Sequence, residues 1–117
     1  MKHHRRNRAL GRDSVQRMAL LKSLTRSMVM HGGIETTIAK AKELRPHVER
    51  LVTMAKKNTL ASRRIVASRT GNDLETVAKL HDVIGPRYAT RPGGYTRITK
   101  LGGAANVAHD TAFIEFV

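Results

Sequence analysis

The sequence predicts an α+β fold in which about four helices pack on a small sheet, and two observations lead to this prediction. Between residues 13 and 84, apolar residues recur every three or four positions, which is the spacing of a helix with one buried face. After a Pro-Gly-Gly turn at 92–94, two segments alternate between apolar and polar residues, as half-buried strands do. At 117 residues the chain is long enough for one compact domain, which we expect to span residues 13–117.

The first predicted helix begins after Asp13, a favoured N-cap residue with Gln16 three positions later. It is expected to end at the two glycines 32 and 33, because glycine readily adopts the positive φ that terminates helices. The apolar positions of this helix keep a spacing of three to four residues: Val15, Met18, Leu21, Leu24 and Met28.

A short strand is a candidate over residues 34–37, after which Thr37 can cap a second helix that runs to about Asn58. The apolar positions of this helix keep their phase past Pro46, so we expect the proline to kink one helix rather than to separate two. A shorter helix is expected over residues 59–69, which contain arginines and no acidic residue.

The last predicted helix begins with a capping-box pattern, because Glu75 follows Asn72 by three positions, and it should stop at the Gly-Pro pair 85–86. Two strands over residues 95–101 and 112–117 are rich in β-forming residues and should form a C-terminal hairpin. The apolar face of the helix consists of five residues: Leu74, Val77, Ala78, His81 and Ile84.

The charge of the chain indicates a strongly anionic partner. Lys and Arg total 22 against 9 Asp and Glu, which gives a formal net charge of +13, far more than solubility requires. Because 40% of the residues are hydrophobic, the chain should fold rather than behave as a basic tail. A peripheral membrane protein typically carries its cations on one face of an amphipathic helix. In this chain the cations are spread over the whole length, which favours a nucleic acid as the partner. No apolar run approaches the roughly 20 residues of a membrane span, so an intracellular protein is expected.

Catalytic and metal-binding patterns are not recognisable in the sequence. The absence of cysteine excludes disulfides, cysteine zinc sites and thiol catalysis. The six histidines do not have the spacing of a zinc site, and the adjacent His109 and Asp110 do not make a catalytic triad. Glycine-rich nucleotide loops are also missing. We therefore expect neither an enzyme nor a cofactor, a metal or a small-molecule substrate.

Residues 1–12 are predicted to form a basic arm that stays unfolded until it meets its partner. The segment MKHHRRNRALGR has no acidic residue and no helical apolar repeat. Twelve extended residues reach about 40 Å, far enough to enter between RNA helices. The alternative is a tail that only improves solubility.

The segment RYATRPGGYTR, residues 87–97, combines a turn with three arginines and both tyrosines of the chain. Arginine binds phosphate with a planar fork, and a tyrosine ring can stack on an exposed base. Packing of the rings in the core is an equal alternative for Tyr95.

Lys40 and Lys42 lie just after a predicted helix N-terminus, where a bound phosphate would stabilise them. An ordinary solvated helix face is the competing interpretation for these two lysines. The full set of predicted RNA-binding residues is Lys2, His3, His4, Arg5, Arg6, Arg8, Arg12, Arg17, Lys40, Lys42, Arg87, Arg91, Tyr95 and Arg97.

Three stretches resemble one family from end to end of the chain: MKHHRRNRALGR, IETTIAKAKELRPHVERLVTMAK and GPRYATRPGGYTRITKLG. The chain resembles the bacterial-type large-subunit ribosomal protein seventeen family, and AFIEFV at 112–117 is similar to the closing strand of that family. Departures are small: Lys2 stands where arginine is common, and the loop GGAANVAHD carries less charge than usual, which puts RNA contact by that loop in doubt.

The resemblance implies a structural protein of the large ribosomal subunit in the cytoplasm, with no enzymatic activity. Its partners would be the large-subunit (23S) ribosomal RNA, near the exit of the nascent-peptide tunnel, and neighbouring large-subunit proteins. A DNA-binding protein that uses a helical pair is the main alternative, but a recognition helix and a self-association face are not identifiable in the sequence. An RNA-processing enzyme would need an acidic or metal cluster that is also not recognisable.

Overall fold

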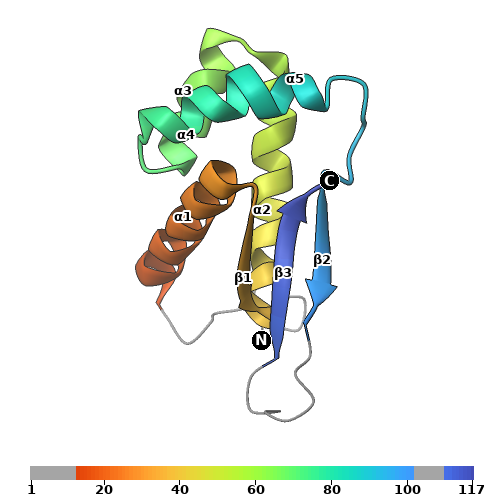
Figure 1. Ribbon diagram of the computed structural model, residues 1–117. Coiled ribbons are helices and arrows are strands. Elements are labelled where there is room, and N and C mark those ends of the chain that lie inside the picture. The colour runs from red at the N-terminus through yellow and green to blue at the C-terminus, as the bar shows by residue number, and fades with distance from the viewer. Residues whose placement is uncertain (1–12, 102–109) are drawn as a thin grey trace, which may run out of the picture.

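The computed structural model describes residues 13–101 and 110–117, and in these residues helices pack around a three-stranded antiparallel sheet (Figure 1). This arrangement confirms the predicted α+β fold with about four helices and a C-terminal hairpin. The predicted arm, residues 1–12, lies outside the described residues. The elements are α1 (Ser14–His31), β1 (Gly33–Thr37), α2 (Ile38–Lys57), α3 (Leu60–Arg69), α4 (Leu74–Lys79), the π-helical turn η1 (Leu80–Ile84), α5 (Gly85–Arg87), β2 (Thr96–Lys100) and β3 (Thr111–Phe116).

The sheet has the strand order β1-β3-β2, so the strand nearest the C-terminus lies in the middle. Ile114 of β3 pairs with Ile34 of β1 on one side and with Ile98 of β2 on the other. Along β3 the buried residues alternate, and Ala112, Ile114 and Phe116 are the ones that are buried. Because alternate residues of a strand share one face, this face is the one that packs on α2 behind the sheet (Figure 1).

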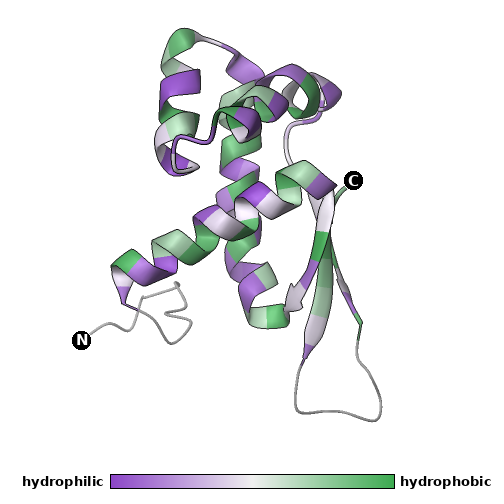
Figure 2. Ribbon diagram, turned by 60° about the vertical axis from the view of Figure 1, so that its left-hand side comes forward, coloured by the Kyte–Doolittle hydropathy of each residue, from purple (hydrophilic) through white to green (hydrophobic). Residues whose placement is uncertain are grey.

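Helix α2 is the centre of the core, and it contacts the sheet, α1, α3, η1 and α5. Thr37 caps it as predicted, because the Thr37 hydroxyl accepts a hydrogen bond from the Lys40 amide at 3.2 Å. The helix runs through Pro46 without a break, which confirms one helix rather than two. Figure 2 shows hydrophobic and hydrophilic residues interspersed along the helices, as expected for amphipathic helices. The buried residues of α2 are Ala41, Leu44, His47, Val48, Leu51, Val52 and Ala55.

Helix α1 has the predicted caps, but its first turns project beyond the core. Asp13 Oδ1 accepts a hydrogen bond from the Gln16 amide at 2.8 Å, and Gly32 ends the helix with a φ of 82°. From Leu21 onward the apolar side chains are buried or half-buried. Val15 and Met18 are 78% and 39% exposed, so the predicted apolar face was wrong for these two residues. The helical period fixes which side a residue faces, but not where along a helix the contact with its neighbours begins.

The last helical stretch differs from the prediction at its start. Asp73, not Asn72, is the N-cap residue of α4, and Asn72 instead adopts a positive φ of 60° in the preceding turn. The Asp73 carboxylate accepts a hydrogen bond from the Thr76 hydroxyl at 2.6 Å and also binds Arg26 of α1. The hydrogen bond from Thr76 is the main reason why the pKa of Asp73 is lowered. The Asp73 side chain therefore makes no capping hydrogen bond, and the predicted capping box at Asn72 was wrong.

The same stretch also differs at its end and on its predicted face. The chain does not stop at the Gly-Pro pair 85–86 but widens into η1 and continues as α5 to Arg87. In η1 the Gly85 amide bonds to the Leu80 carbonyl five residues back, and Pro86 then occupies the first turn of α5, where its missing N–H costs little. Leu74 is 79% exposed and Ala78 is also exposed, whereas Val77, His81 and Ile84 are buried.

Candidate nucleic-acid interface

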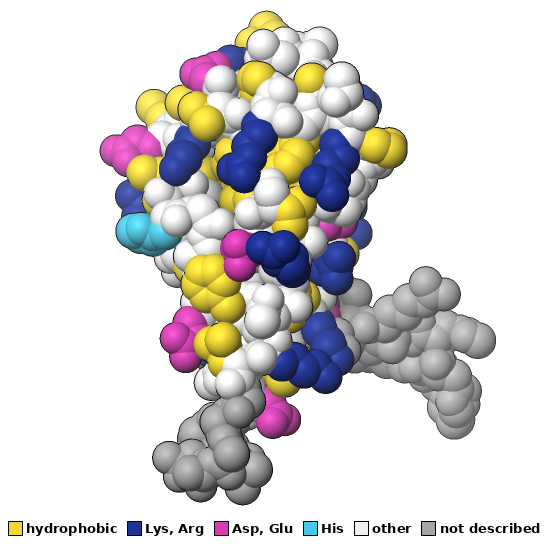
Figure 3. All heavy atoms as spheres, turned by 45° about the vertical axis from the view of Figure 1, so that its right-hand side comes forward, with side chains coloured by type: hydrophobic (Ala, Val, Ile, Leu, Met, Phe, Trp, Pro, Cys, Tyr) yellow, Lys and Arg dark blue, Asp and Glu magenta, His cyan; other side chains and the backbone are white. Residues whose placement is uncertain are grey.

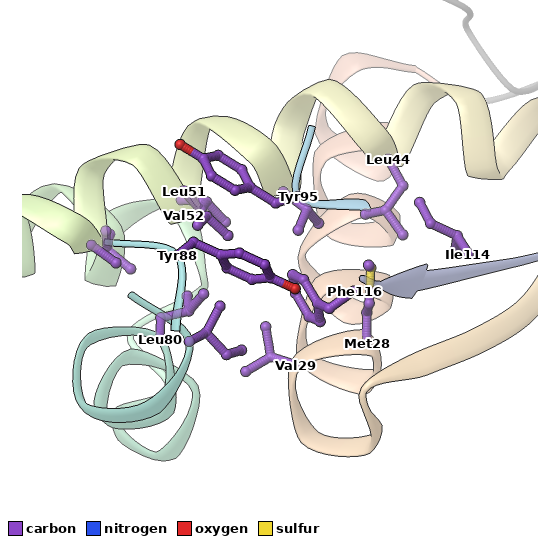
Figure 4. Close-up of a cluster of buried hydrophobic side chains, with 14 of the residues drawn as sticks. Met28, Val29, Leu44, Leu51, Val52, Leu80, Tyr88, Tyr95, Ile114 and Phe116 are labelled. Atoms are coloured by element: carbon purple, nitrogen blue, oxygen red, sulfur yellow. The ribbon is translucent and has the colours of Figure 1, made fainter. Parts of the chain in front are cut away.

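Both tyrosines of the 87–97 segment are buried. Tyr88 and Tyr95 are 3% and 1% exposed, and their ring centroids lie 5.2 Å apart with the planes tilted by 50°. Figure 4 shows the two rings among apolar side chains from α1, α2 and the sheet, with Leu51, Val52 and Phe116 nearby. The rings therefore fix the turn to the core.

The two tyrosine hydroxyls bind groups of the protein itself. The Tyr88 hydroxyl donates to the Val117 carbonyl, and burial raises the pKa of Tyr88. The Tyr95 hydroxyl accepts a hydrogen bond from Lys56 Nζ at 3.1 Å and lies 3.4 Å from the Thr53 hydroxyl. Hydrogen bonding to Thr53, followed by Lys56, lowers the pKa of Tyr95.

Tyr95 is consequently corrected from a candidate base-stacking residue to a core residue. A ring that stacks on a base needs one accessible face, and a side chain that is 1% exposed does not offer one. Lys56 also lies over this ring, with its Nζ atom 5.1 Å from the centroid. Of the two interpretations of Tyr95 left open above, packing in the core is the one that the structure supports.

A polar connection between α2 and β2 fixes the end of the turn. Glu49 Oε2 accepts hydrogen bonds from the Thr96 amide at 3.2 Å and from the Thr96 hydroxyl at 2.8 Å. Arg45 reaches the same region, with its Nε atom 3.7 Å from Glu49 Oε2 and its guanidinium 3.4 Å from the Thr96 carbonyl oxygen. These contacts hold the first residue of β2 against the central helix.

The three predicted arginines of this segment are all exposed, but they have different surroundings. Arg87 donates to the Val117 carbonyl at 2.9 Å and stacks over Tyr88. Arg97 forms an ion pair with Glu115 at 3.2 Å. The Arg91 side chain makes no hydrogen bond or ion pair within residues 13–101 and 110–117, so it is available to a phosphate without losing a partner.

The other predicted RNA-binding residues lie away from this turn or outside the described residues. Arg17 is half-buried near the start of α1, and Lys40 and Lys42 lie in the first turns of α2, half-buried and exposed respectively. Figures 1 and 2 place the starts of α1 and α2 toward one end of the molecule and the segment 88–95 toward the other. Not described are Lys2, His3, His4, Arg5, Arg6, Arg8 and Arg12.

Basic side chains also cover parts of the surface that the sequence prediction did not include. Figure 3 shows Lys and Arg side chains in a row across the upper part of one face and continuing below it on the right. The middle of the chain supplies exposed or half-buried cations: Arg45, Arg50, Lys56, Lys57, Arg64 and Arg69. The acid-free composition of residues 59–69 was the signal for Arg64 and Arg69. Arg45 and Arg50 of α2 had no such signal, since Glu43 and Glu49 lie close to them in the sequence, whereas Lys56 and Lys57 belong to the same acid-free stretch.

The described residues offer no site for a metal ion or a membrane span. Within residues 13–101 and 110–117, no group of three or more His, Asp or Glu side chains could hold a metal. In the same part of the chain, none of the helices has both the length and the apolar character needed to cross a bilayer.

The fold and this surface define a small basic α+β protein with arginines and lysines exposed on several elements. A model of the family described as ribosomal protein L17 matches residues 20–117, and the chain therefore belongs to the ribosomal protein L17 family. The resemblance found in the sequence is thereby confirmed. Members of this family are structural components of the ribosome rather than enzymes.

Two relatives are similar over the whole chain. A protein of Sphingopyxis alaskensis is 49% identical over 117 residues, which are all of this chain and 84% of the relative. A protein of Gemmatimonas aurantiaca is 49% identical over the same length, which covers 98% of that relative. Both are named large ribosomal subunit protein bL17.

Proposed function

We propose that this chain is a structural constituent of the large ribosomal subunit and that it binds the large-subunit ribosomal RNA. The observation that carries the proposal is membership of the ribosomal protein L17 family over residues 20–117. The names of the two relatives support the large subunit as the site of assembly. The net charge of +13 supports RNA as the partner, because phosphate neutralisation dominates the affinity of proteins for nucleic acids.

The proposed interface combines the arm with cations of the domain formed by residues 13–117. Exposed Arg91 and Lys42 can reach a phosphate directly, whereas exposed Arg87 must share its guanidinium with the Val117 carbonyl. Arg97 can do so by exchanging its ion pair with Glu115 for a phosphate. The remaining proposed contacts are Lys2, His3, His4, Arg5, Arg6, Arg8, Arg12, Arg17 and Lys40, whereas Tyr95 is left out because its ring is buried.

A position near the exit of the nascent-peptide tunnel, and contacts with neighbouring large-subunit proteins, are part of the same proposal. They follow from the resemblance to the family, whose members bind on that side of the subunit. Assembly into the ribosome would place the chain in the cytoplasm of a bacterial cell.

Sedimentation of a tagged chain through a sucrose gradient tests this function. We expect the protein to travel with the large subunit after a high-salt wash, since a network of phosphate contacts outlasts a single exposed ion pair. A variant lacking residues 2–12 should remain folded by circular dichroism and be washed off at lower salt. Recovery of the chain in free fractions, or equal affinity for duplex DNA and for a large-subunit RNA transcript, would contradict the proposal and favour a DNA-binding protein.

A further inference from the structure

A groove lies between α2 and the turn of the 87–97 segment, and a buried tyrosine forms its floor. Its volume is about 320 Å³, which is within the roughly 300 to 1,000 Å³ of small-ligand sites. Because positions three and four residues apart share one face of a helix, the α2 residues of the groove form one continuous wall. The lining residues are Pro46, Glu49, Arg50 and Thr53 of α2, Pro92 and Gly93 of the turn, and Tyr95 beneath them.

Hydrogen bonds hold the two walls of the groove together. Lys56 Nζ donates to the Arg91 carbonyl at 2.5 Å and to the Tyr95 hydroxyl at 3.1 Å, so it ties the residue before Pro92 to α2. The Thr53 hydroxyl lies 3.4 Å from the same Tyr95 hydroxyl, and Figure 4 shows the Tyr95 ring against α2. The groove is therefore preformed, and a ligand does not have to order the turn before it binds.

Pro46 lines the groove although it weakens the helix that carries it. A proline inside a helix lacks the N–H that would bond to the carbonyl four residues back, and it is much less favourable there than alanine. The Pro46 ring is exposed, so it does not offset this loss by packing in the core. Pro92 is also exposed, and the groove thus has a rigid apolar ring on each wall. Apolar side chains on either side of a slot can hold a nucleobase between them.

Arg50 and Arg91 place unpaired positive charge at this groove. Arg50 lines it from α2, and Arg91 directly precedes Pro92. Both side chains are exposed, and neither forms a hydrogen bond or an ion pair within residues 13–101 and 110–117. A guanidinium without a protein partner can bind a phosphate with two parallel hydrogen bonds.

We propose that this groove binds one nucleotide of the ribosomal RNA, with the base between Pro46 and Pro92 and the phosphate at Arg50 and Arg91. This inference rests on the proposed RNA binding and deepens it, because it adds a contact with a base to contacts with phosphates. An unpaired base of a folded RNA can leave its stack and enter such a site. Phosphate contacts carry no sequence information, whereas a base contact distinguishes one RNA position from another.

Glu49 supplies the acceptor that selects the base. Its Oε2 atom accepts hydrogen bonds from the Thr96 amide and hydroxyl and lies 3.7 Å from Arg45 Nε, whereas Oε1 has no hydrogen bond within the described residues. A carboxylate oxygen can accept a hydrogen bond from the exocyclic amino group of cytosine, adenine or guanine, but uracil has no such group. The groove should therefore prefer a base that carries an amino group.

Glu49→Gln tests this preference with two short RNAs of equal length and charge. Oligocytidylate should bind the unmodified chain about fivefold more tightly than oligouridylate, the effect of one hydrogen bond. In Glu49→Gln the amide oxygen must still accept from Thr96, so its NH2 group turns to the groove and should favour the O4 atom of uracil. Glu35→Gln is the control, because it changes the charge equally at an exposed position of β1 and should leave the preference for cytosine unchanged. A preference that is absent from the unmodified chain, or that survives Glu49→Gln, would overturn the base contact.

Pro46→Ala separates binding from folding, because the two effects have opposite signs. The substitution restores a helical hydrogen bond and should raise the melting temperature, while the affinity for oligocytidylate falls about threefold with the lost apolar surface. Pro86→Ala is the control, since Pro86 is an exposed proline in the first turn of α5 and does not line the groove. Unchanged affinity in Pro46→Ala would overturn the groove as the site of the base.

Arg50→Gln tests the phosphate contact. It should weaken the binding of both short RNAs by about tenfold and lower the slope of log affinity against log salt by about 0.7. Arg69→Gln removes the same charge from an exposed position of α3 outside the groove and should change neither quantity for a short RNA. Equal losses in the two variants would overturn Arg50 as the phosphate ligand.

The backbone amides of Thr53 and Gly93 report on the groove by NMR without any substitution. We expect both signals to shift at stoichiometric oligocytidylate and to respond to cytidine monophosphate only at far higher concentrations. Saturation by the mononucleotide, with no further effect of RNA, would assign the groove to a free nucleotide and overturn RNA as the ligand. Unchanged signals with both ligands would overturn the site itself.

A comparison of a large-subunit RNA transcript with duplex DNA keeps this proposal apart from the proposed function. If the unmodified chain does not prefer the transcript, the proposed function fails. If the chain prefers the transcript while Pro46→Ala and Arg50→Gln behave like their controls, the groove alone fails.

Discussion

The 87–97 segment and helix α3 each contain three arginines, but more of the arginines in the segment bind to the protein itself. In the segment, Arg87 donates to the Val117 carbonyl and Arg97 pairs with Glu115, whereas the Arg91 side chain has no such partner within the described residues. In α3, Arg63 pairs with Asp82, whereas Arg64 and Arg69 form no ion pair within residues 13–101 and 110–117. The segment therefore satisfies two of its three arginines within the protein, whereas two of the three arginines of α3 remain available to a ligand.

This difference shows that the number of cations in a segment does not locate an RNA interface. A lysine that already donates to carbonyl and hydroxyl oxygens contributes to the fold, and it must lose those bonds before it can bind a phosphate. An arginine without a protein partner gives up no hydrogen bond within the protein when it binds a phosphate. The predictions below separate the two roles, beginning with the variant in which the fold should suffer most.

Tyr95→Ala should give the largest effect, a loss of about 3 to 5 kcal/mol in the free energy of unfolding. The substitution removes a buried ring that packs against Tyr88 and accepts a hydrogen bond from Lys56. Urea denaturation followed by circular dichroism measures the loss. Tyr95→Phe is the control: it keeps the ring, and it should cost about 1 kcal/mol and leave RNA affinity unchanged. A reduced RNA affinity at normal stability in Tyr95→Phe would contradict a purely structural role of this hydroxyl.

Glu49→Ala should destabilise the fold by about 1 to 3 kcal/mol, because the Thr96 amide and hydroxyl both lose their acceptor. Glu35→Ala changes the net charge equally at an exposed position of β1 and should alter the free energy of unfolding by less than about 0.5 kcal/mol. The same denaturation experiment compares them. Equal effects would mean that charge, and not the connection to β2, decides the stability.

Much of the fold could be predicted from the sequence because it is specified locally. Asp13, Thr37 and Gly32 have cap positions that adjacent residues determine, and the structure places them there. The apolar period of α2 was sufficient to predict a continuous helix through Pro46. By contrast, Asp73 occupies the N-cap position of α4 without a capping hydrogen bond from its side chain, which instead binds Arg26, 47 residues away in the sequence; a local pattern contains no information on that contact.

The candidate site was harder to predict because its residues depend on tertiary contacts. The pattern of arginines and tyrosines at 87–97 was compatible with either stacking or packing, and only the burial of Tyr95 decides between them. Tertiary packing also decides which cations have a protein partner: Arg63 pairs with Asp82, 19 residues away in the sequence, whereas its neighbour Arg64 forms no ion pair within the described residues.

The pH dependence of stability tests the surroundings of His47. Its pKa is lowered from the ordinary value near 6.5 by burial and by the neighbouring cations. Below that value the unfolded chain therefore binds a proton that the folded chain refuses, so stability falls as the pH drops from 7 to 5, by at most about 1.4 kcal/mol per pH unit. His47→Leu should remove this part of the slope. Equal slopes in the two proteins would show that His47 titrates normally.

Arg91→Ala and Arg97→Ala should have the smallest effects on stability, within about 0.5 kcal/mol, because both side chains are exposed. Their effects on RNA affinity should differ. Arg91 can bind a phosphate without losing a partner, whereas Arg97 must first leave Glu115, so Arg91→Ala should weaken binding more. Glu115→Gln sharpens this test: it frees Arg97 and should raise RNA affinity slightly in a filter-binding assay. A lower affinity in Glu115→Gln would mean that the ion pair itself positions Arg97 for RNA, and the contrast between paired and unpaired cations would then not hold at this turn.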